Sequence, residues 1–146
     1  MASTAKKQNH HLHMIIGCGR FGAGVASMFS SDGHEVVTID VLKDSFNRLS
    51  PSYTGFTIEA DACDIHALEN ADINEASVVL VATGDDNINI MVSQIAKVIF
   101  EVPTVITRLY DVEKEALLTD SGVNVIYPAK LEIGAFRKIF GIAAEE

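Results

Sequence analysis

The chain has 146 residues, of which 48% are hydrophobic, and a formal net charge of −9. This length predicts one domain with a hydrophobic core, and the apolar content is too high for a disordered chain. The acidic charge argues against a nucleic-acid partner and against electrostatic binding to anionic lipid. No apolar run approaches the roughly 18 residues that span a bilayer, so we expect no direct membrane insertion. The two cysteines suggest no disulfide framework and fit a reducing cytoplasm.

Short β-rich runs alternate with helical patterns along most of the chain, after a polar N-terminal tail at residues 1–10. The pattern predicts strands near 12–17, 35–40, 55–60, 77–82, 103–108 and 123–127, and helices near 20–31, 43–49, 64–70, 86–100, 112–121 and 129–141. Such alternation is typical of parallel sheets with crossover helices. We therefore expect one α/β domain at residues 11–142, with a Rossmann-like, doubly wound parallel sheet of six strands in the order 3-2-1-4-5-6.

A glycine-rich loop follows the first predicted strand and opens the first predicted helix. Its sequence, Gly17-Cys-Gly-Arg-Phe-Gly22, fits the G-x-G-x-x-G pattern of dinucleotide-binding sites. Gly17 permits the tight turn, Gly19 lets a pyrophosphate approach the backbone, and Gly22 lets the helix pack close to the strand. Free N–H groups at the start of the helix attract phosphate. The candidate phosphate-binding residues are Gly17, Cys18, Gly19, Arg20, Phe21 and Gly22.

Polar residues also follow other predicted strands. Asp40 ends the second strand, where a carboxylate accepts hydrogen bonds from ribose hydroxyls and repels a 2′-phosphate. Thr83 and Gly84 follow the fourth strand and Arg108 ends the fifth, at the edge of the sheet where ligands bind in open α/β folds. The alternatives are a glycine turn without a ligand, a polar strand end at Asp40, and pairing of Arg108 with a carboxylate such as Asp111.

Two predicted helices are too apolar for the surface of a monomer. In residues 88–100 and 131–142, apolar side chains occupy more than one helical face. A surface helix needs one apolar face, so the extra apolar surface indicates a further cover. We expect a homodimer or a larger ring through helices 86–100 and 129–141. The alternative is that both helices are central in the fold.

The glycine loop resembles the G-x-G-R-x-G loop of the RCK domains, regulators of K⁺ conductance that are also called KTN or TrkA-N domains. The resemblance covers roughly residues 12–140. The further segments that carry it are His34–Asp40, Ala60–Cys63, Thr83–Asn89, Ile106–Arg108 and Ser121–Pro128. Thr83–Asn89 resembles the family's T-x-x-D-x-x-N run, and Ala60-Asp-Ala-Cys63 stands where the family usually has Gly-Asp-Ala-Thr. The family consists of cytosolic nucleotide-sensing subunits of potassium channels and transporters.

The resemblance implies an adenine nucleotide as the cofactor: NAD(H), ATP, ADP or AMP. It implies that Arg20 senses phosphate and that Asp61 and Ala62 form a wall beside the adenine. Two alternatives stay open for these side chains. Arg20 would otherwise be a solvated surface arginine, and Asp61 would otherwise cap the helix that starts near Asp64.

Two departures from the family pattern concern metal binding and length. Ala129 stands where many members have a glutamate that helps form a metal or phosphate site. The sequence stops after the last predicted helix, so we expect no smaller C-terminal domain of the family in residues 1–146. His10, His11 and His13 cluster, but no acid or cysteine lies nearby, so we expect no metal site. Cys18 is expected to contribute only its backbone N–H, and no residue is assigned a catalytic role.

These features predict a regulatory, non-catalytic nucleotide-binding subunit or domain of a K⁺ channel or transporter. It would be cytoplasmic, or peripheral to the inner face of the plasma membrane through a membrane-embedded K⁺ channel or transporter subunit. The alternative is the NAD-binding half of a dehydrogenase: Tyr110 and Lys114 have the Y-x-x-x-K spacing of short-chain enzymes, but their serine and a substrate domain are missing. A methyltransferase is disfavoured because Ile15 stands where those loops usually have an acid.

Overall fold

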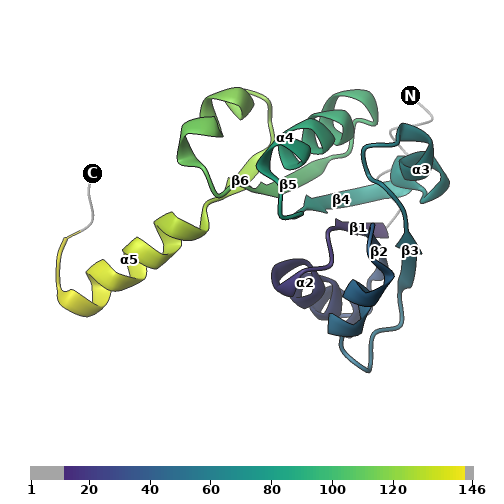
Figure 1. The fold of residues 1–146 in the computed structure, drawn as a ribbon, viewed down its shortest axis with the longest axis horizontal. Helices are drawn as coiled ribbons and strands as arrows, with labels where there is room; N and C mark the ends of the chain where they lie inside the picture. The colour runs from purple at the N-terminus through teal and green to yellow at the C-terminus, as the bar shows by residue number, and fades with distance from the viewer. Residues whose placement is uncertain (1–11, 144–146) are drawn as a thin grey trace.

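Six parallel strands form one sheet in the order β3-β2-β1-β4-β5-β6, as the alternation of the sequence predicts (Figure 1). This computed structural model describes residues 12–143, so the predicted tail at 1–10 lies outside the described residues, as do His10 and His11. The strands are β1 (Leu12–Ile16), β2 (Glu35–Asp40), β3 (Phe56–Glu59), β4 (Ala76–Val81), β5 (Thr104–Arg108) and β6 (Asn124–Ile126). The strand order reverses between β1 and β4, and a doubly wound sheet binds its ligand at this switch point.

The connections between strands include regular helices and tighter turns. The α-helices are α2 (Arg20–Ser31), α3 (Ile65–Asn70), α4 (Asp86–Gln94) and α5 (Pro128–Phe140). The helices expected near 43–49 and 112–121 are the 3₁₀ segments η1 (Lys43–Arg48) and η4 (Val112–Leu118), and a further 3₁₀ turn is η2 (Ile73–Glu75). The helix expected at 86–100 has the predicted extent but changes type, because α4 continues into the π-helical η3 (Ile95–Ile99).

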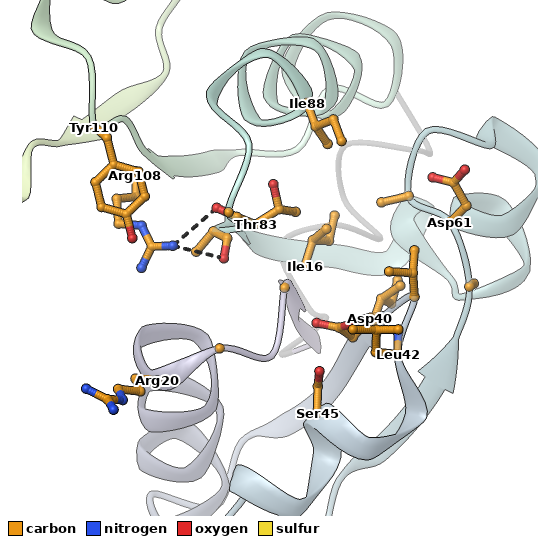
Figure 2. Close-up of a pocket in the computed structure, with 18 residues that line it drawn as sticks. Ile16, Arg20, Asp40, Leu42, Ser45, Asp61, Thr83, Ile88, Arg108 and Tyr110 are labelled. Carbon is orange, nitrogen blue, oxygen red and sulfur yellow. Dashed lines mark hydrogen bonds between the residues drawn. The ribbon is translucent and has the colours of Figure 1, made fainter.

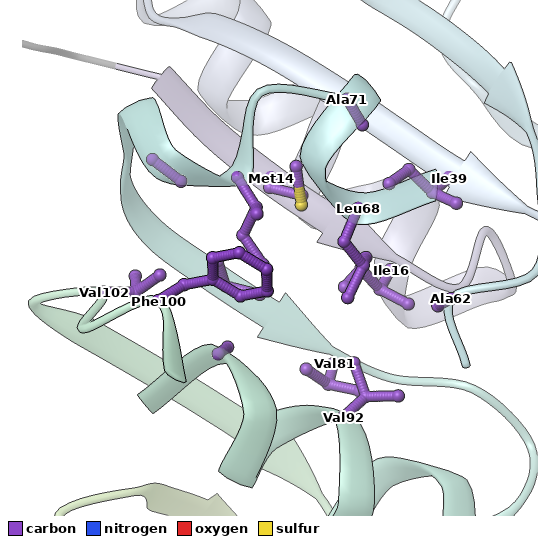
Figure 3. Packing of buried hydrophobic residues seen from close by; sticks show 14 of the residues in the cluster. Met14, Ile16, Ile39, Ala62, Leu68, Ala71, Val81, Val92, Phe100 and Val102 are labelled. Carbon is purple, nitrogen blue, oxygen red and sulfur yellow. The ribbon is translucent and has the colours of Figure 1, made fainter. Parts of the chain in front are cut away.

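The central strand β1 pairs with β2 on one side and β4 on the other, and both of its faces are buried. Met14 and Ile16 pack against α3 and α4 through side chains such as Leu68 and Val92 (Figure 3). Ile15 faces the opposite side and packs in the cluster that includes Ala26 of α2. Helices therefore cover both faces of the sheet, which explains the nearly continuous apolar sequence of its central strands.

The last helix, α5, extends from the end of β6 away from the sheet (Figure 1). It has no buried residue, although it carries several large apolar side chains. Ile139 is 88% exposed, and Leu131, Phe136 and Phe140 are also exposed. The alternative that this helix is central in the fold is wrong for α5.

The preceding helix differs from α5, because Ile90 and Val92 of α4 are buried in the chain's own core. The apolar residues of α4 are thus partly explained by intrachain packing. Among residues 12–143, no helix is long and apolar enough to cross a bilayer.

Candidate functional site

A cavity of about 480 Å³ lies at the carboxyl ends of β1 to β5, at the switch point of the sheet (Figure 2). Of the site residues expected from the sequence, the structure brings nine to its wall: Gly17, Gly19, Arg20, Asp40, Asp61, Ala62, Thr83, Gly84 and Arg108. Cys18, Phe21 and Gly22 do not line the cavity, although they belong to the same loop. The pocket therefore gathers residues from five segments that are far apart in the sequence.

The glycine loop has the backbone geometry that its sequence predicts. Gly17 has a φ of +97°, and a Cβ on this residue would collide with the carbonyl of Ala82. A Cβ on Gly22 would collide with the carbonyl oxygen of Gly17, so both positions require glycine. Apart from its chain neighbours, no described residue comes within 4 Å of a Cβ built at Gly19, which is the N-cap of α2 and lines the pocket. The start of α2 is therefore open to the cavity, where helix N–H groups favour an anion.

Asp40 anchors the loop to the end of β2. Its Oδ2 accepts a hydrogen bond from the Cys18 N–H at 2.7 Å, and its Oδ1 accepts one from the Leu42 N–H at 2.8 Å. A carboxylate can accept about four hydrogen bonds, so two acceptor positions remain for ribose hydroxyls. Asp40 therefore both shapes the loop and presents acceptors to the pocket.

Cys18 is a buried residue of the loop, and its backbone N–H, which was expected to serve a phosphate, instead donates to Asp40. Burial and the negative charge of Asp40 raise the pKa of the Cys18 thiol, against the opposite effect of Arg48. A thiol with a raised pKa is a poor nucleophile at neutral pH.

Asp61 lies at the end of the pocket next to α3. Its Oδ1 accepts a hydrogen bond from the Cys63 N–H at 2.9 Å. The helix is capped by Asp64 instead, whose Oδ1 accepts from the His66 N–H at 3.0 Å. The alternative that Asp61 caps this helix is therefore wrong, because the cap lies three residues later. Asp61 and Ala62 remain on the pocket wall.

Asn89 joins the carboxyl ends of β4 and β5. It is completely buried, and its Oδ1 accepts hydrogen bonds from the N–H and the Oγ1 of Thr83 at 3.0 and 2.6 Å. Its Nδ2 donates to the carbonyl oxygens of Thr83 and Arg108 at 3.1 and 2.9 Å. A buried amide satisfied on both sides fixes its neighbours, so Asn89 holds two strand ends at one spacing.

Asp86 adds a second link at the same edge of the sheet. Its two carboxylate oxygens accept hydrogen bonds from the backbone N–H groups of Tyr110 and Asp111 at 2.9 and 2.8 Å. The T-x-x-D-x-x-N run thus has a structural role here. Its threonine, aspartate and asparagine position the loops after β4 and β5.

Arg108 lines the pocket at the end opposite Asp61 (Figure 2). Its Nη2 donates to the carbonyl oxygens of Thr83 at 3.2 Å and Ala82 at 3.4 Å. Asp111 does not pair with it but caps η4, accepting from the Glu113 N–H at 3.0 Å. The alternative of an Arg108–Asp111 pair is therefore wrong.

The other pocket arginine, Arg20, is exposed, and its side chain points away from the remaining pocket residues (Figure 2). It lies at the start of α2, as the sequence predicts, with its charge at the rim of the cavity. Its position is compatible both with a solvated arginine and with contact to a phosphate at the rim.

Sequence reasoning missed several pocket residues, among them Val41, Leu42, Ser45, Ile88 and Tyr110. Most of these side chains are apolar and carry no chemical signature. Their one available signal is position: Val41 and Leu42 directly follow Asp40, at the edge of the sheet where ligands bind.

The histidine at the other end of β1 has a packing role. His13 is only 8% exposed, and its ring packs at a tilt against those of Phe29 and His34, with centroid distances of 4.3 and 4.4 Å. Within residues 12–143, no group of three histidine, cysteine or acidic side chains could hold a metal ion.

A sequence model described as the TrkA-N domain matches residues 13–128, which include most of the fold and every residue that lines the pocket. The chain belongs to the TrkA-N domain family. It is 36% identical over 107 residues to a Trk system potassium uptake protein TrkA homolog of Pyrococcus horikoshii, covering 73% of this chain and 47% of that protein. It is 32% identical over 116 residues to the Trk system potassium uptake protein TrkA of Streptomyces coelicolor, covering 79% of this chain and 52% of that protein. The chain thus spans about half the length of these relatives.

Solved structures of the GsuK channel have the same fold. The TM-score is 0.76 for GsuK bound to NAD and 0.74 for GsuK bound to ADP, each at 23% sequence identity. The matches cover 91% and 94% of this TrkA-N chain, and 24% and 35% of the GsuK chains. At this identity the likeness shows the fold.

Proposed function

We propose that this TrkA-N domain binds an adenine nucleotide, one of NAD(H), ATP, ADP and AMP, in the pocket at the switch point and acts as a regulatory, non-catalytic part of a K⁺ channel or transporter. The observation that carries the proposal is the convergence of the open N-terminus of α2, the carboxylate of Asp40 and the Asp61 corner on one cavity. These groups complement the phosphate, ribose and base of one nucleotide. The nucleotide-binding domain corresponds to residues 11–142.

The residues that line the pocket favour one orientation of the bound nucleotide. Asp40 provides acceptors for ribose hydroxyls, and a 2′-phosphate would meet its negative charge. Apolar side chains near Asp61, including Leu42 and Ile88, offer a surface for the flat base. The phosphates then lie at Gly19 and the start of α2.

The regulatory role is supported by the names of related proteins and by α5. The relatives are potassium uptake proteins, and GsuK is a channel with NAD-bound and ADP-bound structures. The exposed apolar face of α5 suits a homodimer or a larger ring, through which a nucleotide-dependent change would reach a membrane partner on the cytoplasmic side. A nucleotide can shift an equilibrium between two conformations only if it binds them with different affinities.

The dehydrogenase alternative has little support in the geometry. Tyr110 stacks on Arg108, while the Nζ of Lys114 donates to the Oδ1 of Asn87 at 3.1 Å. Lys114 does not line the pocket, so the Y-x-x-x-K spacing does not place both groups at the cavity. The positions of these two side chains therefore favour nucleotide binding without catalysis over hydride transfer.

Native mass spectrometry of freshly purified protein tests the proposal, followed by thermal-shift measurements with adenine nucleotides and S-adenosylmethionine. A ligand that binds the folded state raises the unfolding temperature. We expect a co-purified adenine nucleotide, or stabilisation by at least one added adenine nucleotide and none by S-adenosylmethionine. Stabilisation by S-adenosylmethionine alone would contradict the proposal.

A further inference from the structure

A second cavity, of about 470 Å³, lies beside the strand β3, at the opposite end of the sheet from the nucleotide pocket. We call it the edge groove, because β3 forms one edge of the sheet (Figure 1). The first residues of β1, β2 and β3 line it, namely Leu12, Glu35 and Phe56, together with residues at the end of α3 and in η2. The edge groove shares no residue with the nucleotide pocket, so it needs an explanation of its own.

The wall of the edge groove combines apolar side chains with an open strand edge. Phe56 is 72% exposed, and the apolar Val37 and Ile58 also line the groove. The strand β3 pairs with β2 alone, and an edge strand presents backbone N–H and C=O groups that no strand pairs. The hydroxyl of Tyr53 donates to one of these carbonyls, that of Phe56, at 2.8 Å. Such an edge suits an extended segment that lies along it.

The charge of the edge groove is acidic. Glu35, Asp72 and Glu75 line it, and no lysine or arginine is among the described residues of its wall. Glu35 and Asp72 are exposed, and neither forms an ion pair within residues 12–143. Because opposite charges steer and align two surfaces, a basic segment complements this groove.

The chain itself contains a basic segment next to the groove. Residues 1–11 lead directly into Leu12 of the groove wall, and they include Lys6 and Lys7 but no aspartate or glutamate. The strand β3 is two strands away from β1, which is about 10 Å at the usual strand spacing. The five residue steps from Lys7 to Leu12 span up to about 17 Å, so both lysines can reach the far side of the groove. A short tether also gives the segment a high effective concentration there, so weak contacts suffice.

We propose that residues 1–11 lie in the edge groove, with Lys6 and Lys7 beside the carboxylates of Glu35 and Asp72. The segment then covers the open edge of β3 and shields Phe56 from solvent and from other chains. Natural proteins cover or charge such edges because an exposed edge strand pairs with other molecules. Since ion pairs at a surface are weak and are screened by salt, occupancy of the groove should fall as the salt concentration rises.

A tryptophan in place of Phe56 reports on the groove, because the chain has no tryptophan of its own. We expect the Phe56→Trp reporter to emit at shorter wavelength, and to be quenched less by acrylamide, than the same reporter in Lys6→Glu/Lys7→Glu protein. Sodium chloride at 1 M, where the Debye length is about 3 Å, should remove this difference. Val98→Trp is the matched control reporter, since Val98 is 71% exposed on η3 and does not line the groove. Its emission should not respond to the lysine changes.

A charge swap assigns the effect to the groove. Adding Glu35→Lys to the Lys6→Glu/Lys7→Glu reporter should restore part of the protection from acrylamide, whereas adding Glu113→Lys, an exposed change on η4, should not. An emission of the Phe56→Trp reporter that ignores both salt and the lysine changes would overturn the proposal. Protection that depends on protein concentration and not on Lys6 and Lys7 would overturn it in favour of a second copy of the chain at this edge.

Discussion

Replacing Asp40 with alanine should weaken every ligand that contains an adenosine ribose. Hydrogen bonds to a charged group contribute about 1.5–3 kcal/mol, so losing the ribose contacts should reduce affinity about 10- to 150-fold. The change also removes the acceptor of the buried Cys18 N–H, which should lower the free energy of unfolding by about 1–3 kcal/mol. The Leu42 N–H, which is near solvent, can bond to water instead.

Isothermal titration calorimetry with ADP measures the affinity, and urea unfolding measures the stability. Asp32→Ala is the matched control, because Asp32 is an exposed residue at the end of α2 that does not line the pocket. Asp40→Asn keeps an oxygen acceptor for the Cys18 N–H, so it serves as a second test if Asp40→Ala protein does not fold. An ADP affinity unchanged in folded Asp40→Ala protein would remove Asp40 from the site and refute the reasoning.

Three further predictions concern the phosphate end, the polar link and the last helix. If Arg20 senses phosphate, Arg20→Ala should weaken ATP about fivefold by calorimetry and AMP less, because an exposed guanidinium at the rim would reach distal phosphates; equal losses would argue against phosphate sensing. Asn89→Ala should lower the free energy of unfolding by about 2–4 kcal/mol in urea titrations, since it leaves buried backbone groups unpaired; a smaller loss than that of Asp32→Ala would contradict its linking role. The chain should form a dimer or larger assembly in light scattering, and Ile139→Glu should dissociate it while Lys138→Glu does not. A monomeric unmodified protein at micromolar concentration would contradict the role of α5.

The strand order and the glycine loop could be predicted because each has a recognisable pattern in the sequence. Alternating strands and helices permit few doubly wound topologies. Gly17 and Gly22 are required by backbone collisions that any side chain at these positions would cause. The position of Asp40 at the end of β2 likewise follows from strand periodicity.

The roles of single polar side chains could not be predicted in the same way. Asp61 and Asp64 both precede α3, and only the path of the backbone decides which of them caps the helix. Arg108 has a carboxylate three residues away, yet its side chain turns toward β4, because Asp111 is used by η4. These outcomes depend on contacts between segments that are distant in the sequence.

The exposed face of α5 illustrates a different limit. Its apolar composition predicts burial, but the sequence does not say whether the cover is the chain's own sheet or another molecule. The structure shows that the chain's own sheet does not cover α5, since this helix has no buried residue within the described chain. The oligomeric partner stays a prediction.

A crystal structure of the protein grown with ADP above its calorimetric Kd tests the central claim most directly. The account predicts electron density for ADP at the switch point, with phosphate oxygens at the Gly19 end of α2, ribose hydroxyls bonded to Asp40 and the base beside Asp61. ADP bound elsewhere on the molecule, or no ADP density in this pocket, would contradict it.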